Sequence, residues 1–257
     1  MLPFTVQLAR RAGAVLREGA SQPRQIDKKG PFDLVTNVDR ASEALIIAAI
    51  RERFPDHGIL AEEGGGVESD SPWLWVIDPL DGTNNFAHDF PYYCVSLGLL
   101  YERAPYLGVV YDPTRDQLFT AQRGGGAHLN GAPIRVSSAA SLGDALLSTG
   151  FPYDFATNER NNAAEFARVH RLVQGIRRAG SAALDLASVA CGRLDAHWEF
   201  WLKPWDSSAA ALILLEAGGM ITDADGGEWT PWSTSMVASN GQIHAELLAA
   251  IRGGDAR

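Results

Sequence analysis

Hydrophobic residues recur every three or four positions in six stretches of this chain. This spacing places them on one face of a helix, so the pattern predicts six helices. The predicted ranges are 3–18, 38–54, 158–173, 182–191, 205–217 and 242–251. The second helix also has a start signal, because Thr36 is followed three positions later by Asp39, which is the pattern of a capping box.

Between these stretches lie runs rich in β-branched and aromatic residues, which predict strands. The predicted strands are 58–61, 73–77, 93–101, 106–111, 117–122, 145–148, 194–200 and 236–239. Several of them follow one another without an intervening helix, which favours antiparallel or mixed sheets over a regular alternation of strand and helix. The pattern therefore predicts an α+β fold in which helices and sheets pack in layers.

Length and composition are those of an ordinary globular protein. The chain has 257 residues, of which 46% are hydrophobic and 21% are charged. It is long enough to bury roughly 70 to 75% of the surface that it exposes when unfolded. No apolar run approaches the ~18 residues of a membrane-spanning helix, and the first arginines lie inside the apolar N-terminal stretch, unlike those of a signal peptide. We therefore expect a cytoplasmic protein with no membrane partner.

The net charge of −9 limits the partners further. A nucleic acid is not expected as a ligand, because binding to its backbone depends on clustered Lys and Arg. Carboxylates also repel phosphate, so an acidic site that handles phosphate requires a cation between the two. The two cysteines, Cys94 and Cys191, lie apart in apolar surroundings and are expected to be reduced.

Five acidic residues in three separated segments are the main candidates for chemistry. They are Glu62, Glu63, Asp78, Asp81 and Asp206. Asp78 and Asp81 follow a strongly apolar predicted strand, and the Leu80 carbonyl lies between them as a further oxygen donor. Mg²⁺ prefers carboxylate and carbonyl oxygens and often completes its shell with water and substrate phosphate. The acids predict a magnesium site and phosphate chemistry, while the Asp-Pro sequence taken alone also fits a surface turn.

The residues directly after Asp81 predict a phosphate-binding turn. Gly82, Thr83 and Asn84 resemble the opening turn of a short helix. The free N–H groups and the positive end of the dipole at a helix start favour an anion such as phosphate. Thr83 also places a hydroxyl beside the predicted metal site, and an ordinary capping role for Thr83 is compatible with this one.

Two segments, WVIDPLDGTNNFAHDFP and KPWDSSAAALILLEAGG, resemble the two signatures of the inositol monophosphatase family. DLVTNVD at positions 33–39 and the Glu62 and Glu63 pair match the other landmarks of that family in the same order, so the resemblance covers essentially the whole chain. It implies a layered αβαβα sandwich, Mg²⁺-dependent hydrolysis of small phosphate monoesters, sensitivity to lithium and a homodimer. We expect one unit, with an N-terminal half (about 1–140) that carries most metal ligands and a C-terminal half (about 141–257) that carries Asp206 and the substrate contacts.

The resemblance also implies roles for individual residues. The metal ligands would be Glu62, Asp78, Asp81, Asp206 and the Leu80 carbonyl. Glu63 corresponds to a residue near the outer metal, and Lys28 corresponds to a basic residue of a flexible flap. Asp39 and Thr83 match the pair that, together with Glu62, orients the attacking water.

The substrate contacts come from the C-terminal half. The segment GSAALD resembles the bacterial branch of the family, in which it contacts the alcohol portion of the substrate together with a Glu seven residues before the last metal ligand. That Glu is Glu199, which by itself also fits a surface residue at the end of a strand. The other candidates are Gly180, Ser181, Ala182 and Asp185.

Three residues depart from the common family pattern. Asn84 stands at a usual Thr, Asp89 at a usual Gly or basic residue, and Ala211 at a usual Gly. None of them removes a predicted ligand, and Asp89 is expected to add negative charge near the mouth of the site.

Inositol monophosphate is the expected substrate, and several alternatives stay open. On the same fold they are fructose 1,6-bisphosphatase, histidinol-phosphate phosphatase and 3′(2′)-nucleotide phosphatase activities, the last disfavoured by Asn84. A different class of function is a protein that binds the transcription or ribosome-maturation machinery. The intact set of ligands favours an enzyme that acts on a small phosphorylated polyol or sugar.

Overall fold

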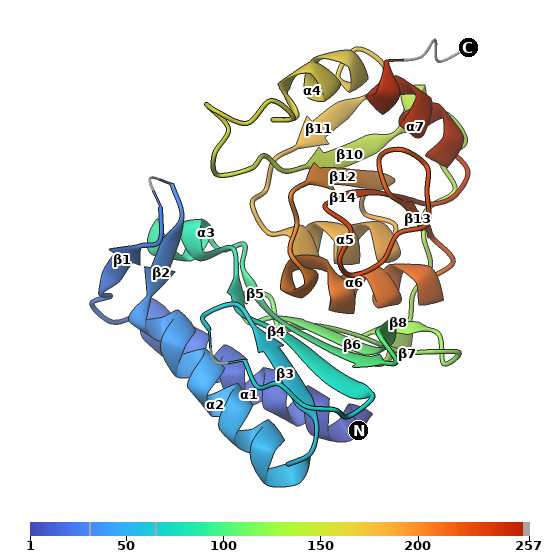
Figure 1. Cartoon of the computed structure of the whole chain (residues 1–257). Coiled ribbons are helices and arrows are strands. Elements are labelled where there is room, and N and C mark those ends of the chain that lie inside the picture. Colours follow the sequence, from blue (N-terminus) through green and yellow to red (C-terminus); the bar gives the residue numbers. More distant parts are fainter. Residues whose placement is uncertain (31, 65, 254–257) are drawn as a thin grey trace.

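Five layers make up the molecule, which is described here by a computed structural model over residues 1–30, 32–64 and 66–253. The order is a helix pair, a sheet, a second helix pair, a second sheet and a third helix pair (Figure 1). The first pair is α1 (Leu2–Ala20) and α2 (Asn37–Arg53), the second is α5 (Ala182–Ala190) and α6 (Pro204–Glu216), and the third is α4 (Ala163–Val169) and α7 (His244–Arg252). This confirms the predicted layered α+β fold.

The first sheet has seven strands in the order β3-β4-β5-β6-β7-β8-β9. Their bounds are Gly58–Ala61, Trp73–Asp81, Cys94–Tyr101, Ala104–Asp112, Gln117–Gln122, Ala127–Leu129 and Ala132–Pro133. Only the β3–β4 pair is parallel, and the remaining pairs are antiparallel. This long antiparallel run agrees with the predicted succession of strands.

The second sheet has five strands in the order β11-β10-β12-β14-β13, and its pairing is mixed. Their bounds are Gly175–Arg177 for β11, Leu146–Thr149 for β10, Ala196–Phe200 for β12, Ser235–Ser239 for β14 and Met220–Thr222 for β13. The connection between the two sheets includes the short helix η1 (Leu142–Asp144), and the predicted division near residue 140 falls in this connection. Residues 254–257 of the predicted C-terminal half lie outside the described residues.

Small residues bring α6 against the first sheet. Ala209, Ala210 and Ala211 are buried in the core between the two sheets. A Cβ added at Gly108 of β6 would lie 2.3 Å from the Ala209 carbonyl oxygen, so only glycine permits this approach of helix and strand. Ala211 is therefore a packing residue, and the close packing of α6 sets the backbone position of Asp206 at its start.

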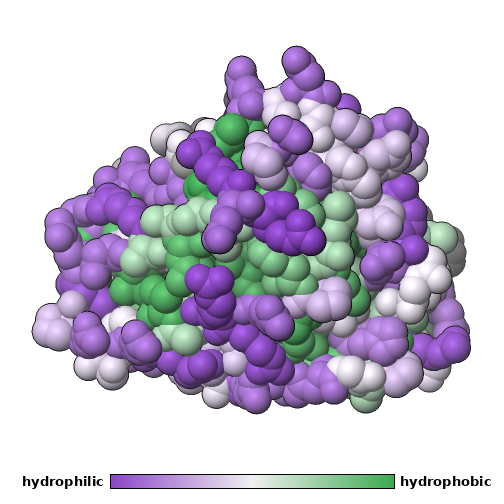
Figure 2. Space-filling model, turned by 90° about the horizontal axis from the view of Figure 1, so that it is seen from below, coloured by the Kyte–Doolittle hydropathy of each residue, from purple (hydrophilic) through white to green (hydrophobic). Residues whose placement is uncertain are grey.

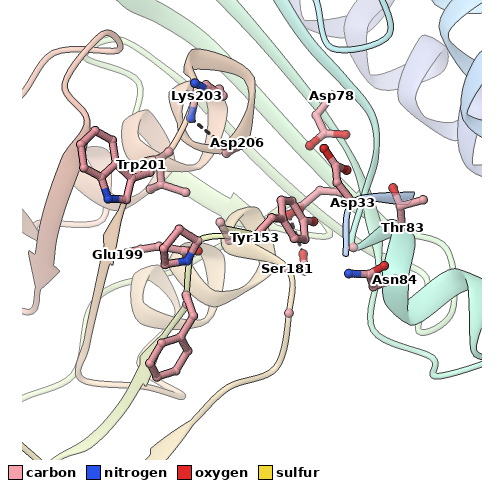
Figure 3. Close-up of a pocket in the computed structure, with 18 of the residues that line it drawn as sticks. Asp33, Asp78, Thr83, Asn84, Tyr153, Ser181, Glu199, Trp201, Lys203 and Asp206 are labelled. Atoms are coloured by element: carbon pink, nitrogen blue, oxygen red, sulfur yellow. Dashed lines mark hydrogen bonds between the residues drawn. The ribbon is translucent and has the colours of Figure 1, made fainter. Parts of the chain in front are cut away.

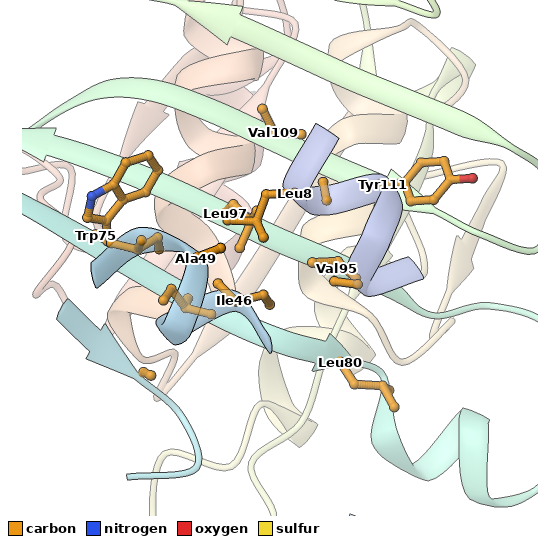
Figure 4. Close-up of a cluster of buried hydrophobic side chains, with 14 of the residues drawn as sticks. Leu8, Ile46, Ala49, Trp75, Leu80, Val95, Leu97, Val109 and Tyr111 are labelled. Carbon is orange, nitrogen blue, oxygen red and sulfur yellow. The ribbon is translucent and has the colours of Figure 1, made fainter. Parts of the chain in front are cut away.

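A separate hydrophobic core lies between the first sheet and α1 and α2. Leu8, Ile46, Trp75, Leu97 and Val109 meet there, all fully or almost fully buried (Figure 4). The surface of this layer, seen from below in Figure 2, shows hydrophobic residues over its centre, interrupted by a few hydrophilic ones, and mostly hydrophilic residues around them. This core anchors β4, the strand that carries the acidic residues.

All six predicted helices are present, with one clear error in length. The helix predicted at 158–173 is α4, which begins only at Ala163. Asn162 before it has a positive φ of 73°, and the Asn158 and Asn161 side chains accept hydrogen bonds from backbone N–H groups in turns. Asn competes with the helix in this way, because its short side chain satisfies the backbone locally.

Several short strands were not predicted from the sequence pattern. β1 (Ile26–Lys28) and β2 (Leu34–Thr36) form a hairpin, and β8, β9, β11 and β13 have two or three residues each. A period of two residues cannot be recognised over so few positions. The hairpin matters for the site, because it carries a lysine to the acidic residues.

Candidate active site

A cavity of about 790 Å³ lies between the two sheets and the start of α3 (Thr83–Ala87). It brings together most of the residues that the sequence singled out. From the N-terminal half these are Glu62, Asp78, Leu80, Asp81, Gly82 and Thr83, and from the C-terminal half Gly180, Ser181, Ala182, Asp185, Glu199 and Asp206. Figure 3 shows Asp78 and Thr83 on one side of the cavity and Glu199 and Asp206 on the other.

A bulge in β4 turns its acidic residues toward the cavity. The pairing of β4 with β5 shifts between Asp78 and Asp81, as happens where one strand has extra residues. The strand was predicted to end at residue 77, but it continues to Asp81, so the acids lie within the strand and not after it. Asp78 accepts a hydrogen bond from the Leu80 N–H at 3.0 Å, which fixes the bulge.

Asp81 is held by the other half of the molecule. Its Oδ2 accepts hydrogen bonds from the Ser181 hydroxyl at 2.6 Å and from the Ala183 N–H at 2.8 Å, at the start of α5. Ser181 also caps this helix, because its hydroxyl accepts a bond from the Leu184 N–H. Within the described residues Asp81 Oδ1 has no hydrogen bond, so one oxygen is fixed and the other is available to a ligand.

Thr83 and Asp39 form the pair that the resemblance implied. The Thr83 hydroxyl lies 2.9 Å from Asp39 Oδ1 and 3.0 Å from the Leu80 carbonyl oxygen. Asp39 is fully buried behind Thr83 and also accepts bonds from the Thr36 N–H and hydroxyl, which makes it the second half of the predicted capping box. Burial raises the pKa of Asp39, although the bonds from Thr36 and Thr83 oppose this shift.

The lysine that reaches the acids is Lys29. Its Nζ lies 3.0 Å from Glu62 and 2.6 Å from Glu63. Lys28, the flap lysine expected from the resemblance, lies in the same hairpin with an exposed side chain. Glu63 does not line the cavity, and its N–H donates to the Glu43 carboxylate at 2.8 Å. The signal for Lys29 was present in the sequence as the second lysine of a pair.

Burial raises the pKa of every acid in this group, and the neighbouring negative charges add to the effect. The pKa values of Asp78 and Asp206 lie well above their usual range. Those of Asp81 and Glu63 are raised to about 7, and that of Glu62 is also raised, although Lys29 opposes the shift. Two carboxylates about 4 Å apart repel by roughly 4 kcal/mol at an effective dielectric near 20, so full ionisation without a cation is unfavourable.

The oxygen donors of the cavity are of the type that binds a hard cation, but they lie too far apart to coordinate one ion together. Carboxylates and a backbone carbonyl are the ligands that Mg²⁺ prefers, and neither Cys nor His lines the cavity among the described residues. In the same part of the chain, no group of three or more acidic, His or Cys side chains is close enough to hold an ion as it stands. Asp206 instead accepts a hydrogen bond from the Lys203 N–H at the start of α6 (Figure 3). Coordination of Mg²⁺ by this group therefore requires water ligands or a rotation of the Asp206 side chain toward the other acids.

The opposite wall of the cavity carries the predicted substrate contacts. Asp185 accepts a hydrogen bond from the Tyr92 hydroxyl at 2.7 Å. Gly180 has a positive φ of 88°, a conformation that favours glycine. Arg178 and Lys203 also line the cavity and bring positive charge to it, although their sequence positions predicted no role.

The residues that depart from the family pattern have different surroundings. The Asn84 amide lines the cavity and donates to the Phe32 carbonyl oxygen at 3.1 Å. Asp89 pairs with Arg24 and is not among the residues that line the cavity. The expectation that Asp89 adds negative charge at the mouth is therefore wrong, because its charge is compensated by Arg24 beside it.

Comparison with known proteins places this site in a family. A model of the inositol monophosphatase family matches residues 1–254. The chain is 49% identical to inositol-1-monophosphatase of Synechocystis over 93% of this chain and 84% of that protein. It is 43% identical to Nus factor SuhB of Pseudomonas aeruginosa, with 98% of this chain and 96% of the relative covered. The structure of inositol monophosphatase from Anabaena matches with a TM-score of 0.90 and 44% identity, over 99% of this chain and 96% of that one.

The fold, the acid-lined cavity and these similarities define a hydrolase of the phosphatase class. The chain belongs to the inositol monophosphatase family, which is generally metal-dependent. The resemblance noted in the sequence motifs is thus confirmed. Within residues 1–30, 32–64 and 66–253, no helix combines the length and the apolar character needed to cross a membrane.

Proposed function

We propose that this protein hydrolyses inositol monophosphate, or a closely related small polyol phosphate, with Mg²⁺ as its cofactor. One observation carries the proposal: a single cavity joins oxygen donors suited to Mg²⁺, Thr83 with Asp39 buried behind it, and a wall with the hydrogen-bond acceptors Asp185 and Glu199. The similarity to inositol-1-monophosphatase of Synechocystis supports the choice of substrate.

Mg²⁺ would be held by residues from both halves of the chain. The proposed ligands are Glu62, Asp78, Asp81, Asp206 and the Leu80 carbonyl, with Glu63 near an outer ion. Bound Mg²⁺ supplies a water of lowered pKa and stabilises the charge of the leaving oxygen. The positive ion would also compensate the repulsion that raises the pKa values of these acids.

Thr83 orients the attacking water in this proposal. Asp39 accepts a hydrogen bond from the Thr83 hydroxyl at 2.9 Å, which leaves the lone pairs of that hydroxyl free to accept a hydrogen bond from the water. Glu62 would accept a hydrogen bond from the second proton of the same water. The backbone N–H groups of Thr83 and the residues that follow it, after Gly82 at the start of α3, would donate hydrogen bonds to the phosphate. Phosphate and water would then be aligned before the reaction, which is the main contribution a protein can make to phosphoryl transfer.

The alcohol portion of the substrate would contact the C-terminal half. Glu199 and Asp185 accept hydrogen bonds from neighbouring hydroxyls, and the turn of Gly180, Ser181 and Ala182 shapes the wall between them. In the β1–β2 flap, Lys29 contacts the acidic side, and the exposed Lys28 beside it would supply further positive charge to the flap. Inhibition by lithium, a homodimer in the cytoplasm and a chain of two half-units that act as one body are further parts of this proposal.

A panel of phosphate esters tests the proposal. Phosphate release would be measured for inositol 1-phosphate, fructose 1,6-bisphosphate, histidinol phosphate and 3′-AMP, each with Mg²⁺, with a chelator, and with Mg²⁺ plus Li⁺. We expect the highest kcat/KM for inositol 1-phosphate, no release with the chelator and less release with Li⁺. Equal release in the chelated sample, or preference for the nucleotide, would contradict the proposal.

A second function is favoured by the similarity to Nus factor SuhB. In this alternative the chain binds the transcription machinery, and its catalysis is secondary. RNA polymerase retained by the protein and equally by a variant that lacks Asp81 would support this alternative, because binding would then be independent of the metal site. Absence of any retained polymerase would leave the enzyme as the sole proposal.

A further inference from the structure

We propose that His197 is a positioning residue that fixes Glu199 for recognition of the substrate hydroxyls. The inference rests on the proposed function, because it assigns Glu199 to the alcohol portion of the substrate. His197 and Glu199 lie two positions apart on β12, so their side chains project from the same face of the sheet. His197 is fully buried and does not line the cavity, whereas Glu199 does.

The imidazole of His197 lies between two carboxylates of the cavity wall. Its Nε2 is 3.3 Å from Glu199 Oε2, and its Nδ1 is 3.8 Å from Asp185 Oδ2. The Ser148 hydroxyl, on the neighbouring strand β10, lies 2.9 Å from the same Nδ1. Among the described residues Nε2 has no well-aligned hydrogen-bond partner, so the Glu199 carboxylate is the group that it can engage.

The charges around His197 favour its doubly protonated form. A neutral imidazole has one N–H, so one of its two nitrogens would present a lone pair to a carboxylate. Burial alone would lower the pKa of His197, but the Glu199 carboxylate close to Nε2 and the charge of Asp185 raise it above its usual range. Burial raises the pKa of Asp185 to about 7, opposed by His197 and by the Tyr92 hydroxyl. Asp81 on β4 and Arg178 before α5 are the other charged groups that act on this cluster.

Gly150 closes the other side of the Glu199 carboxylate. A Cβ added at Gly150 would lie 1.8 Å from Glu199 Oε1, so the carboxylate rests directly against this backbone. The preceding Thr149 is itself fixed, because its hydroxyl donates to the Trp198 carbonyl oxygen at 2.6 Å. Glu199 therefore lies between Gly150 and His197, and its orientation toward the cavity depends on both neighbours.

This arrangement predicts a selective effect of His197 on substrate binding. Because His197 acts through Glu199, its loss should weaken binding of a phosphate ester whose alcohol carries adjacent hydroxyls. An ester without hydroxyls, such as p-nitrophenyl phosphate, does not use Glu199 and should be unaffected. A purely structural role of His197 would instead affect both substrates alike.

The test compares substitutions that keep one or the other nitrogen. In His197→Gln the amide N–H stands near the position of Nε2, and in His197→Asn it stands near that of Nδ1. We expect His197→Asn to raise KM for inositol 1-phosphate by about tenfold or more, the loss expected for one hydrogen bond to a charged group. His197→Gln should restore most of the binding, and KM for p-nitrophenyl phosphate and both kcat values should stay within about twofold.

Two controls separate the inference from a general loss of stability. His244→Phe removes another buried histidine, which bonds to Thr222 and Ser239 away from the cavity, and it should leave both KM values unchanged. In a Glu199→Gln background, His197→Asn should have no further effect on KM. Equal changes for the two substrates, or additive effects of the two substitutions, would overturn the inference.

The same experiments distinguish a failure of the proposed function from a failure of the inference about His197. Absence of Mg²⁺-dependent hydrolysis of both esters by the wild type would contradict the function and not the role of His197. Calorimetric titration with inositol 1-phosphate then tests the inference without catalysis. Weaker binding to His197→Asn than to His197→Gln would support it, and equal binding to both would overturn it.

Discussion

Replacing Asp81 by Asn should stabilise the metal-free protein while it removes most phosphatase activity. Asp81 Oδ2 accepts hydrogen bonds from Ser181 and Ala183 and a weaker one from the Cys94 thiol, and an Asn side-chain oxygen can accept the same bonds. The Asn amide nitrogen then stands where Oδ1 would contact the metal. The substitution therefore keeps the fold, removes one negative charge from the cluster and replaces a metal ligand by a hydrogen-bond donor.

The expected gain in stability follows from the pKa of Asp81, which burial raises from 3.8 to about 7. At pH 8 the ionised group destabilises the folded state by up to about 4 kcal/mol, because one pKa unit corresponds to about 1.4 kcal/mol. Hydrogen bonds to a neutral amide are weaker than those to a carboxylate, which leaves a gain of about 2 to 3 kcal/mol. For a chain of this size, the melting temperature Tm should rise by about 5 to 10 °C.

The assay is thermal unfolding of both proteins in chelator between pH 4 and pH 8. A carboxyl whose pKa is raised by folding destabilises the folded state progressively as pH rises from its unfolded value near 4 to its folded value near 7. The gain of Asp81→Asn should therefore be largest at pH 8 and vanish near pH 4. Asp225→Asn, at an exposed position outside the cavity, is the matched control and should show no such gain. A variant that is less stable than the wild type at pH 8, or that keeps its Mg²⁺-dependent turnover, would refute the reasoning.

Three further predictions concern other parts of the site. Thr83→Ala should lower kcat by about 10² to 10³, the loss expected for one transition-state contact, with little change in Mg²⁺ affinity, while Thr83→Ser should retain most activity; an unchanged kcat in the Ala variant removes Thr83 from the mechanism. Lys29→Met should lower the Mg²⁺ concentration for half-saturation by about threefold to tenfold, since it frees Glu62 and Glu63; calorimetry that shows no difference from Lys28→Met would contradict this. The chelated wild type should lose stability as pH rises from about 4 to about 7, because folding raises the pKa of Glu63 and Asp81 to about 7, and saturating Mg²⁺ should remove this loss; a Tm that rises over this range in chelator would contradict it.

Periodicity was sufficient for the long elements of the fold. The six helices and the long strands of the first sheet each have enough apolar positions for a period to be recognised, and the capping box at Thr36 located the start of α2 within one residue. The pattern also indicated packing in layers, whereas the αβαβα order of the layers came from the family resemblance. The start of α4 was predicted too early, because side-chain hydrogen bonds in the turns before and at Asn162 replace helical ones there.

The acidic residues of the site were predictable because each lies in a distinctive local sequence. What the sequence did not reveal depends on contacts between distant segments. The ion pairs of Lys29 with Glu62 and Glu63 exist only because the β1–β2 hairpin folds over the cavity. The sequence around His197 is that of an ordinary buried strand. The proposed role of His197 depends on Asp185 of α5, which only the fold places beside it. Asp206 was predicted as a metal ligand, but the hydrogen bond that it accepts from the Lys203 N–H, at the start of α6, was not predicted.

Anomalous diffraction from crystals soaked in Mn²⁺ tests the central claim most directly, because Mn²⁺ takes the same oxygen ligands as Mg²⁺. The account predicts at least one strong peak in the cavity, coordinated by Asp78, Asp81 and the Leu80 carbonyl, with Asp206 turned toward it. Crystals that diffract well after the soak and show no peak among these residues would contradict it.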